Sequence, residues 1–219
     1  MSDEALRDVW LAGDPPADPL PRLREWIDDA HAAPSIAEPD AATLATVGVD
    51  GRPAARLVLV RKLDVEVGTA LFYTNRTSRK GRALAAHPFA SVVFYWDGLA
   101  RQARLEGSVT LTSDAESDAY FASRHPDSRL GAWASDQSEP IASRAELVGR
   151  YETMKTRFGD GSAAPRPPHW GGYRLWIARV ELWASRPHRL HDRVVWERTL
   201  VRNGDGFRGD AWRATRLMP

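Results

Sequence analysis

The stretch Ala42-Thr-Leu-Ala-Thr-Val47, with Asp50-Gly51 and Ala54-Ala-Arg-Leu-Val-Leu-Val-Arg-Lys62 after it, decides the fold. Two short aliphatic segments flank an Asp-Gly pair, which is typical of the tight turn between antiparallel strands. The stretch therefore predicts a β-hairpin, with Arg56 and Arg61 near the two ends of its second strand.

The same pattern recurs along the chain and predicts a mainly β protein. Further strands are expected at residues 69–74, 88–96, 100–111, 170–183 and 211–217, and helices at 19–33, from 78, from 113, at 128–133 and at 143–158. This order predicts an antiparallel barrel with helical insertions, an α+β fold. In the last helix, Leu147, Tyr151, Met154 and Phe158 recur at helical spacing and are expected in the core.

Composition narrows the class of protein. The 219 residues suit a single domain, expected at 19–219, after a flexible leader at 1–18. With 30 Lys and Arg against 29 Asp and Glu, the net charge of +1 argues against a nucleic-acid partner. The chain has no cysteine, no visible signal peptide and no apolar run long enough to span a bilayer. We expect a cytoplasmic protein without a membrane partner.

Seven cations nevertheless fall at expected strand ends and helix starts: Arg56, Arg61, Arg79, Lys80, Arg124, Arg189 and Arg193. Cations in the first turn after the expected N-cap Ser78 oppose the helix dipole unless an anion binds there. Because arginine matches phosphate with two hydrogen bonds, the seven could line one or two phosphate pockets. The alternative is that they are solvated surface charges.

The stretch Trp183-Ala-Ser-Arg-Pro-His-Arg-Leu-His-Asp-Arg193 is the second candidate site. Its last part is expected to be a strand, so Arg189, His191 and Arg193 would share one face. That face could hold an anion, or it could be the solvated edge of a sheet.

Other chemistries have weak signals. His188-x-x-His191 lacks the glutamate and the helix of a zinc protease motif, and no metal site is expected. The sequence contains no Gly-x-Ser-x-Gly elbow and no Gly-rich nucleotide fingerprint. Redox or group-transfer chemistry would therefore need an organic cofactor.

Taken in order, eight motifs resemble those of the pyridoxine/pyridoxamine 5'-phosphate oxidases, over residues 18–219. They are Arg-Leu-Val-Leu-Val (56–60), Phe-Tyr-Thr-Asn-x-x-Ser-Arg-Lys (72–80), Arg-Gln (101–102), Tyr-Phe-x-Ser-Arg-x-x-x-Ser (120–128), Gly-Ala-Trp-x-Ser-x-Gln-Ser (131–138), Trp-Gly-Gly-Tyr (170–173), Arg-Leu-His-Asp-Arg (189–193) and a terminal Arg-Leu-x-Pro. The resemblance implies an FMN-binding split β-barrel of Greek-key type, working as a homodimer with two sites at the interface.

The resemblance also implies a role for each matching residue. Arg56, Arg79 and Lys80 would hold the FMN phosphate, with Ser78 capping the helix beneath it. Further cofactor contacts would come, partly across the interface, from Leu57, Val58, Leu59, Val60, Arg61, Tyr73, Thr74, Gln102, Gln137, Ser138, Trp183 and Arg193. The substrate would be bound by Arg61, Tyr120, Arg124, Ser128, Arg189, Leu190 and His191, of which Arg189 and His191 would be catalytic.

The implied reaction converts pyridoxamine or pyridoxine 5'-phosphate to pyridoxal 5'-phosphate, with hydride transfer from the substrate C4' to flavin N5 and release of H2O2 from O2. Two alternatives stay open. One is a related flavin oxidase acting on another ring, such as the phenazine-biosynthesis oxidases, against which the complete phosphate clamp argues. The other is a non-catalytic flavin-binding barrel, against which Arg189 and His191 argue.

The departures from the family pattern all lie on the substrate side. Arg61 stands where the family usually has lysine, and its larger planar head could reshape the pocket. Glu181-Leu-Trp-Ala184 replaces the usual Glu-Phe-Trp-Gln, and the N-terminal arm is short and acidic.

Overall fold

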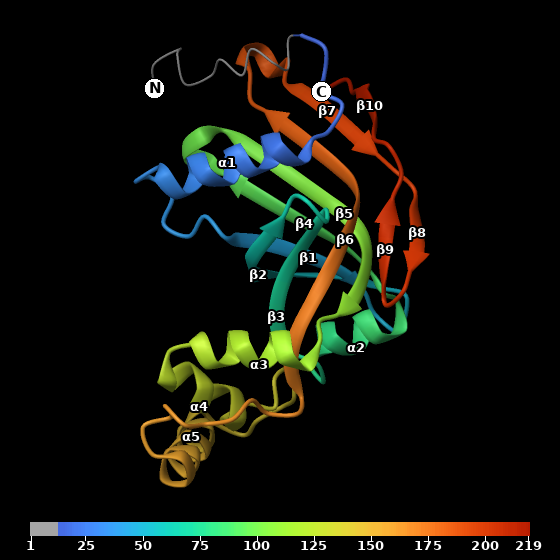
Figure 1. Cartoon of the computed structure of the whole chain (residues 1–219). Coiled ribbons are helices and arrows are strands. Elements are labelled where there is room, and N and C mark those ends of the chain that lie inside the picture. Colours follow the sequence, from blue (N-terminus) through green and yellow to red (C-terminus); the bar gives the residue numbers. More distant parts are fainter. Residues whose placement is uncertain (1–12) are drawn as a thin grey trace.

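Strand β6 (Trp170–Ala184) is hydrogen-bonded along both of its edges in the computed structural model, which describes residues 13–219 (Figure 1). One edge pairs with β5 (Arg101–Leu111) along almost its whole length. The other edge pairs first with β3 (Thr69–Asn75) and then with β7 (Asp192–Glu197). Because β6 changes partner halfway along this edge, the sheet splits there.

Strands β1 (Ala41–Val47), β2 (Pro53–Asp64) and β4 (Phe89–Trp96) complete a closed barrel. The strand order is β6-β3-β2-β1-β4-β5 and back to β6, and every pair is antiparallel. The hairpin predicted around Asp50-Gly51 is the β1–β2 pair, with Thr46 opposite Ala54. The predicted antiparallel barrel with helical insertions is thus confirmed.

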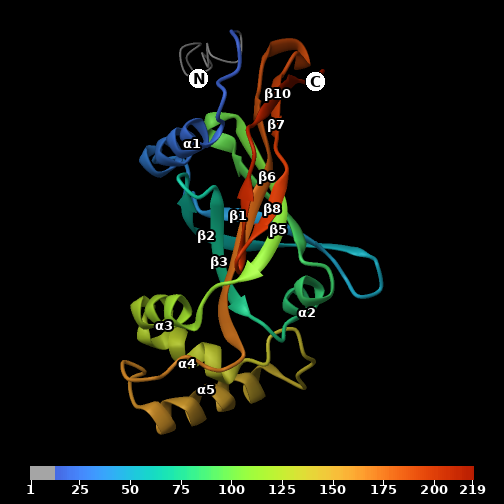
Figure 2. The same ribbon diagram turned by 45° about the vertical axis from the view of Figure 1, so that its right-hand side comes forward.

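The helices lie at the two ends of the barrel and the last strands along its side. The helices are α1 (Leu20–Ala32), α2 (Arg79–Ala86), α3 (Asp114–Ser123), α4 (Pro126–Ala134) and α5 (Arg144–Phe158), with 3-10 turns at Asp97–Leu99 and Pro187–Arg189; the remaining strands are β8 (Leu200–Asn203), β9 (Gly206–Gly209) and β10 (Arg213–Arg216). Helix α1 lies near one end of the barrel, and α3, α4 and α5 lie beyond the opposite end (Figures 1 and 2). Within the described part of the chain, no helix has the length and hydropathy to cross a membrane.

The barrel interior and the inner face of α1 form one hydrophobic core. Its most deeply buried side chains, each at most 1 % exposed, include Leu23, Trp26, Leu44, Val92, Phe94, Leu105 and Ile177. Burying one such side chain contributes about 1.5–3 kcal/mol. The core therefore fixes the barrel rigidly enough to position side chains at its rim.

The prediction that Leu147, Tyr151, Met154 and Phe158 belong to the core is wrong, since no residue of α5 is buried. The helix packs on α4, with the Phe158 ring 5.3 Å from that of Trp133. Helical spacing of apolar residues also suits such a partly covered helix, so periodicity alone overstated burial. The first twelve residues of the predicted leader lie outside the described residues.

A β-bulge interrupts β2 at Arg61. Val60 pairs with Phe72 and Lys62 with Leu71, so Arg61 is an extra residue on its strand. A bulge bends the strand and re-aims the side chain at that position. This irregularity matters below because Arg61 is a predicted ligand-binding residue.

Strands β5 and β6 lie close together at Gly107 because glycine has no side chain. Substitution of Gly107 therefore tests how the barrel closes. A Cβ on Gly107 would lie 1.8 Å from the Trp176 carbonyl oxygen, at the second register shift of the barrel. We expect Gly107→Ala to destabilise the protein by about 1–3 kcal/mol in urea unfolding at fixed protein concentration. Gly149→Ala is the control, since nothing lies within 4 Å of its added methyl group. It should stabilise helix α5 by up to about 1 kcal/mol, and a similar loss in both variants would contradict this account of closure.

Candidate functional site

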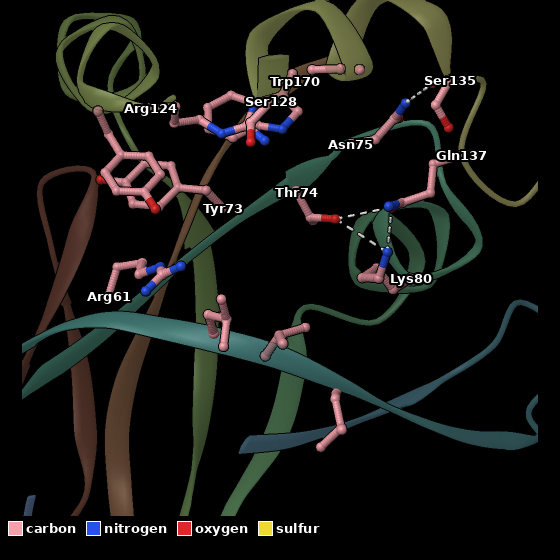
Figure 3. Close-up of a pocket in the computed structure, with 16 residues that line it drawn as sticks. Arg61, Tyr73, Thr74, Asn75, Lys80, Arg124, Ser128, Ser135, Gln137 and Trp170 are labelled. Atoms are coloured by element: carbon pink, nitrogen blue, oxygen red, sulfur yellow. Dashed lines mark hydrogen bonds between the residues drawn. The ribbon is translucent and has the colours of Figure 1, made fainter. Parts of the chain in front are cut away.

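A cavity of about 470 Å³ opens between the barrel and the helices beyond its end. Its floor is the middle of β2, where Leu57, Val58 and Leu59 line it. Thr74 and Asn75 of β3 and Lys80 of α2 lie on one side, and Tyr73, the α3–α4 region and Trp170 lie on the other (Figure 3). The predicted residues that line this cavity are Leu57, Val58, Leu59, Arg61, Tyr73, Thr74, Lys80, Tyr120, Arg124, Ser128 and Gln137.

One side of the cavity carries a buried cation. The Lys80 Nζ donates to Thr74 Oγ1 at 3.1 Å and to Gln137 Oε1 at 2.5 Å (Figure 3), and it also donates to Ser78 Oγ at 3.3 Å. Burial, and then the positive charge of Arg56, lowers the pKa of Lys80 to about 8. The ammonium thus has only neutral oxygens around it and retains a strong attraction for an anion.

Two arginines join Lys80 at the start of α2. Arg56 donates to Thr46 Oγ1 at 2.7 Å and to the Leu44 carbonyl at 3.2 Å, and burial followed by the charge of Arg79 lowers its pKa. Arg79 is the first residue of α2, whose first turn has no acidic residue. In the described chain, no carboxylate forms an ion pair with any of the three cations. This arrangement is that of an anion site at a helix N-terminus.

Ser78 builds the turn beneath that site. It is the N-cap of α2, and its hydroxyl accepts a hydrogen bond from the Gly81 amide. A Cβ on Gly81 would lie 2.0 Å from the Arg76 carbonyl oxygen, so the chain can fold back tightly only with glycine there. The predicted cap is therefore confirmed, and it places Arg79 and Lys80 at the cavity end of the helix.

The opposite side of the cavity is aromatic and holds a second unpaired cation. The rings of Tyr73 and Tyr120 stack 3.8 Å apart, and both lie parallel to Trp170. The Arg124 guanidinium lies 4.8 Å from the Trp170 ring, and its buried Nη1 has no hydrogen-bond partner. Burial lowers the pKa of Arg124. An orphaned guanidinium N–H beside a flat aromatic wall suits an anionic group carried by a planar ring.

The remaining predicted residues divide into two groups. Arg56, Val60, Ser78, Arg79 and Ser138 adjoin the cavity in sequence without lining it, and Val60 is a core residue with 6 % exposure. Gln102, Trp183, Arg189, Leu190, His191 and Arg193 lie at the far end of β5, β6 and β7. From Gly172, opposite Tyr73, to Trp183, β6 extends about 35 Å. A single chain therefore does not bring this second cluster to the cavity.

Within that second cluster, Trp183 is the central residue. It stands opposite Gln102 on one side and Arg193 on the other, and its ring lies 4.6 Å from that of His191. Arg193 donates through Nε and Nη2 to Glu181, a carboxylate with 2 % exposure that also pairs with Arg104. The cluster is a polar patch around one tryptophan face.

The prediction that Arg189, His191 and Arg193 share a strand face is wrong. Residues Pro187–Arg189 form a 3-10 turn, and β7 begins only at Asp192. His188 and Arg189 have φ values of 59° and 63°, in the left-handed region that ends strand pairing. His191 Nδ1 accepts a hydrogen bond from the Arg186 amide at 3.1 Å, which places the proton of a neutral ring on Nε2.

Sequence reasoning also missed several residues that line the cavity. Asn75 and Trp170 both stood inside the motifs quoted above, but the resemblance gave them no role. Gly131, Ala132 and Ser135, from α4 and its C-cap, line it as well, and they too stood inside a quoted motif without an assigned role. Their small size was the available signal, because bulkier side chains there would fill the space.

The chain is similar to known proteins over nearly its whole length. The family described as "Pyridoxamine 5'-phosphate oxidase" matches residues 27–158, and "Pyridoxine 5'-phosphate oxidase C-terminal dimerisation region" matches residues 170–219. The chain is 50 % identical over 213 residues to the pyridoxine/pyridoxamine 5'-phosphate oxidase of Thermosynechococcus vestitus, covering 97 % of this chain and 94 % of that protein. It is 52 % identical over 202 residues to that of Burkholderia multivorans, covering 92 % and 89 %.

Solved structures share the fold. PhzG from Burkholderia lata 383, in complex with tetrahydrophenazine-1-carboxylic acid, superposes with a TM-score of 0.82 at 32 % identity, and 96 % of each chain is covered. A pyridoxamine 5'-phosphate oxidase-related, FMN binding protein from Nostoc punctiforme superposes with a TM-score of 0.67 at 21 % identity, covering 90 % and 97 %. These likenesses confirm the predicted split-barrel fold.

The pKa of Lys80 makes the anion site sensitive to pH. An anion favours the charged ammonium, so its affinity should fall as pH rises through about 8. We expect sulfate, which does not titrate in this range, to bind about tenfold more weakly at pH 9.5 than at pH 7. The measurement is the sulfate-induced rise in melting temperature, against chloride at equal ionic strength. Lys80→Arg should lose this pH dependence, and an unchanged dependence in that variant would contradict the assignment.

Proposed function

The chain belongs to the pyridoxine/pyridoxamine 5'-phosphate oxidase family, and on that premise we propose that it is an FMN-dependent oxidase of pyridoxamine or pyridoxine 5'-phosphate. The observation that carries the proposal is the pair of unpaired cationic sites on the two sides of one cavity. Two phosphorylated rings laid face to face would satisfy both.

The FMN phosphate fits the Lys80 side of the cavity. Arg56, Arg79 and Lys80 gather there without a carboxylate, and the N-terminus of α2 adds its own N–H groups. Tyr73 and Thr74 on β3, Gln137, and the backbone of residues 57–61 would lie along the flavin. When bound, FMN supplies a two-electron acceptor that O2 can reoxidise.

The substrate phosphate fits the Arg124 side of the cavity. The unpartnered Nη1 of Arg124 supplies a donor, and Ser128 and Tyr120 line the same wall. Arg61 adds a further charge at the rim of β2. Phosphate held here is remote from the oxidised carbon, so its binding energy serves to hold the ring in a reactive position.

The second cluster would complete the site from another copy of the chain. Residues 170–219, which match the dimerisation region, contain Trp183, Arg189, Leu190, His191 and Arg193. In a homodimer these residues of the partner subunit, with the partner's Gln102, would cover the open side of the cavity. The partner's Arg189 and His191 would then contact the substrate ring, with the Nε2–H of His191 available as a donor.

A related oxidase acting on an unphosphorylated ring is the second candidate, because the PhzG structure superposes over 96 % of the chain. The two candidates differ in the group that meets Arg124, a phosphate or a carboxylate.

Anaerobic reduction of the flavin separates the candidates. We expect FMN in the purified protein to bleach with pyridoxine phosphate or pyridoxamine phosphate and to remain yellow with a dihydrophenazine carboxylic acid. Bleaching by the phenazine alone would establish the second candidate. A flavin that none of the three reduces would identify a non-catalytic flavin-binding barrel.

Two single variants test the division between cofactor and substrate residues. Arg189→Ala should slow anaerobic bleaching by at least about 100-fold and leave FMN retention near the wild-type level. Arg79→Ala should weaken FMN retention by about tenfold and affect bleaching of the FMN-loaded fraction much less. Equal effects of both variants on both measurements would refute the division.

Co-expression of those two variants tests whether each site draws on two chains. Random pairing makes half of the dimers mixed, and one of the two sites in a mixed dimer has both residues intact. At an FMN concentration too low to load Arg79→Ala on its own, both parent homodimers are inactive, and we therefore expect about one quarter of the wild-type activity in co-expressed protein. Activity no higher than the average of the two variants would show that each site is built within one chain.

A further inference from the structure

Arg61 lies between two cavities. It lines the large cavity with Tyr73 and Arg124, and it also lines a smaller one of about 170 Å³ between α1 and the barrel. The bulge in β2 makes this position possible, because Arg61 is the residue without a strand partner. Its guanidinium can therefore interact with groups on either side.

On the side of the smaller cavity, Asp40 holds Arg61. The Nη1 of Arg61 lies 3.3 Å from Asp40 Oδ2, and Asp40 is the one carboxylate among the described residues that line this cavity. The Asp40 carbonyl accepts a hydrogen bond from the Val60 amide, which fixes Asp40 beside the bulge. The planar guanidinium of Arg61 carries a fork of donors, so one face of it can contact Asp40 while other N–H groups remain available to the larger cavity.

The other charged groups around Asp40 leave it one oxygen for Arg61. His31, in the last turn of α1, contacts Oδ1 at 2.8 Å. Arg24, also on α1, donates to the Leu63 carbonyl instead, and Lys62 pairs with Asp64 at 3.3 Å. The contact to Arg61 is single and longer than the 2.7–2.9 Å of a strong charge-assisted bond, so Arg61 can be displaced toward an anion.

On the side of the larger cavity, Arg61 faces Arg124, the other cation proposed to bind the substrate. Burial is the main cause of the lowered pKa of Arg124. Tyr120 raises this pKa, and the positive charges of Arg129 and Arg61 lower it further. Arg61 and Arg124 therefore repel each other across the cavity, and a dianion between them would relieve that repulsion.

We propose that Asp40 is a positioning residue that sets the affinity of the site for phosphate, by neutralising part of the charge of Arg61 from behind. The inference rests on the proposed function, in which Arg61 contacts the substrate phosphate. Substrate and product of the oxidation carry the same phosphate, so a weaker grip on it also speeds product release. Asp40 thus lowers the affinity for substrate and raises the rate of turnover.

The test is Asp40→Asn, which removes the negative charge of the side chain and keeps its shape. In FMN-loaded Asp40→Asn, KM for pyridoxine phosphate and the inhibition constant of pyridoxal phosphate should both fall about two- to fivefold, because an exposed ion pair has about that effect. The kcat should fall as product release slows. Affinity for unphosphorylated pyridoxine should not change, and Asp40→Glu, which keeps the charge, should resemble the wild type.

Two further variants make the test specific. Asp64→Asn is the matched control, since Asp64 ends the strand that carries Arg61, has the same 22 % side-chain exposure as Asp40, pairs with Lys62 and lines neither cavity. It should leave both constants unchanged. In an Arg61→Gln background, Asp40→Asn should have no further effect, because Asp40 acts through Arg61.

Several outcomes would overturn the inference. They are equal phosphate affinity in wild type and Asp40→Asn at unchanged melting temperature, a similar gain for unphosphorylated pyridoxine, or an effect that persists without Arg61. If the wild type oxidises pyridoxine phosphate and any of these is seen, only the role of Asp40 fails. If the wild type neither binds nor oxidises phosphorylated pyridines, the proposed function fails with it.

Discussion

Hydrogen bonding of β6 along both edges keeps the two groups of candidate site residues apart within one chain. Its first half, paired with β3, carries the cavity with Tyr73 and Trp170. Its second half, paired with β7, carries Trp183 opposite Arg193. A paired strand cannot fold back on itself without breaking its ladder, so one chain holds these two groups at separate places along β6. The rigidity that closes the barrel also divides the site.

The charges of the cavity show what that rigid scaffold is used for. The buried carboxylate of Glu181, by contrast, is paired, since it lies between Arg104 and Arg193. Lys80 has only neutral oxygens, and keeping it charged in the folded protein costs on the order of 3 kcal/mol. Arg124 likewise keeps a buried N–H without a partner. In the proposed function, anions that arrive with the two ligands would offset these two costs.

Sequence alone predicted the features that depend on local rules. The hairpin around Asp50-Gly51 and the Ser78 cap follow from turn and capping chemistry, and both are present. The cations near α2 could be collected but not placed, because their meeting depends on the closure of the barrel. Arg189 was assigned the wrong conformation, since alternation was extended past Pro187 into residues with positive φ. The bulge at Arg61 has no sequence signature, because it arises from register with β3.

The left-handed residues before β7 bear on how the divided site could work. A non-glycine residue with positive φ costs about 1–3 kcal/mol and persists only where its surroundings fix it. Here the surroundings are local: the Arg186 amide bonds His191, and the Arg186 side chain pairs with Asp192. Arg189 is therefore displayed at an exposed turn that is already ordered within one chain. A partner subunit that binds this turn would not have to order it. The entropic cost of positioning Arg189 and His191 therefore falls on folding and not on dimer assembly.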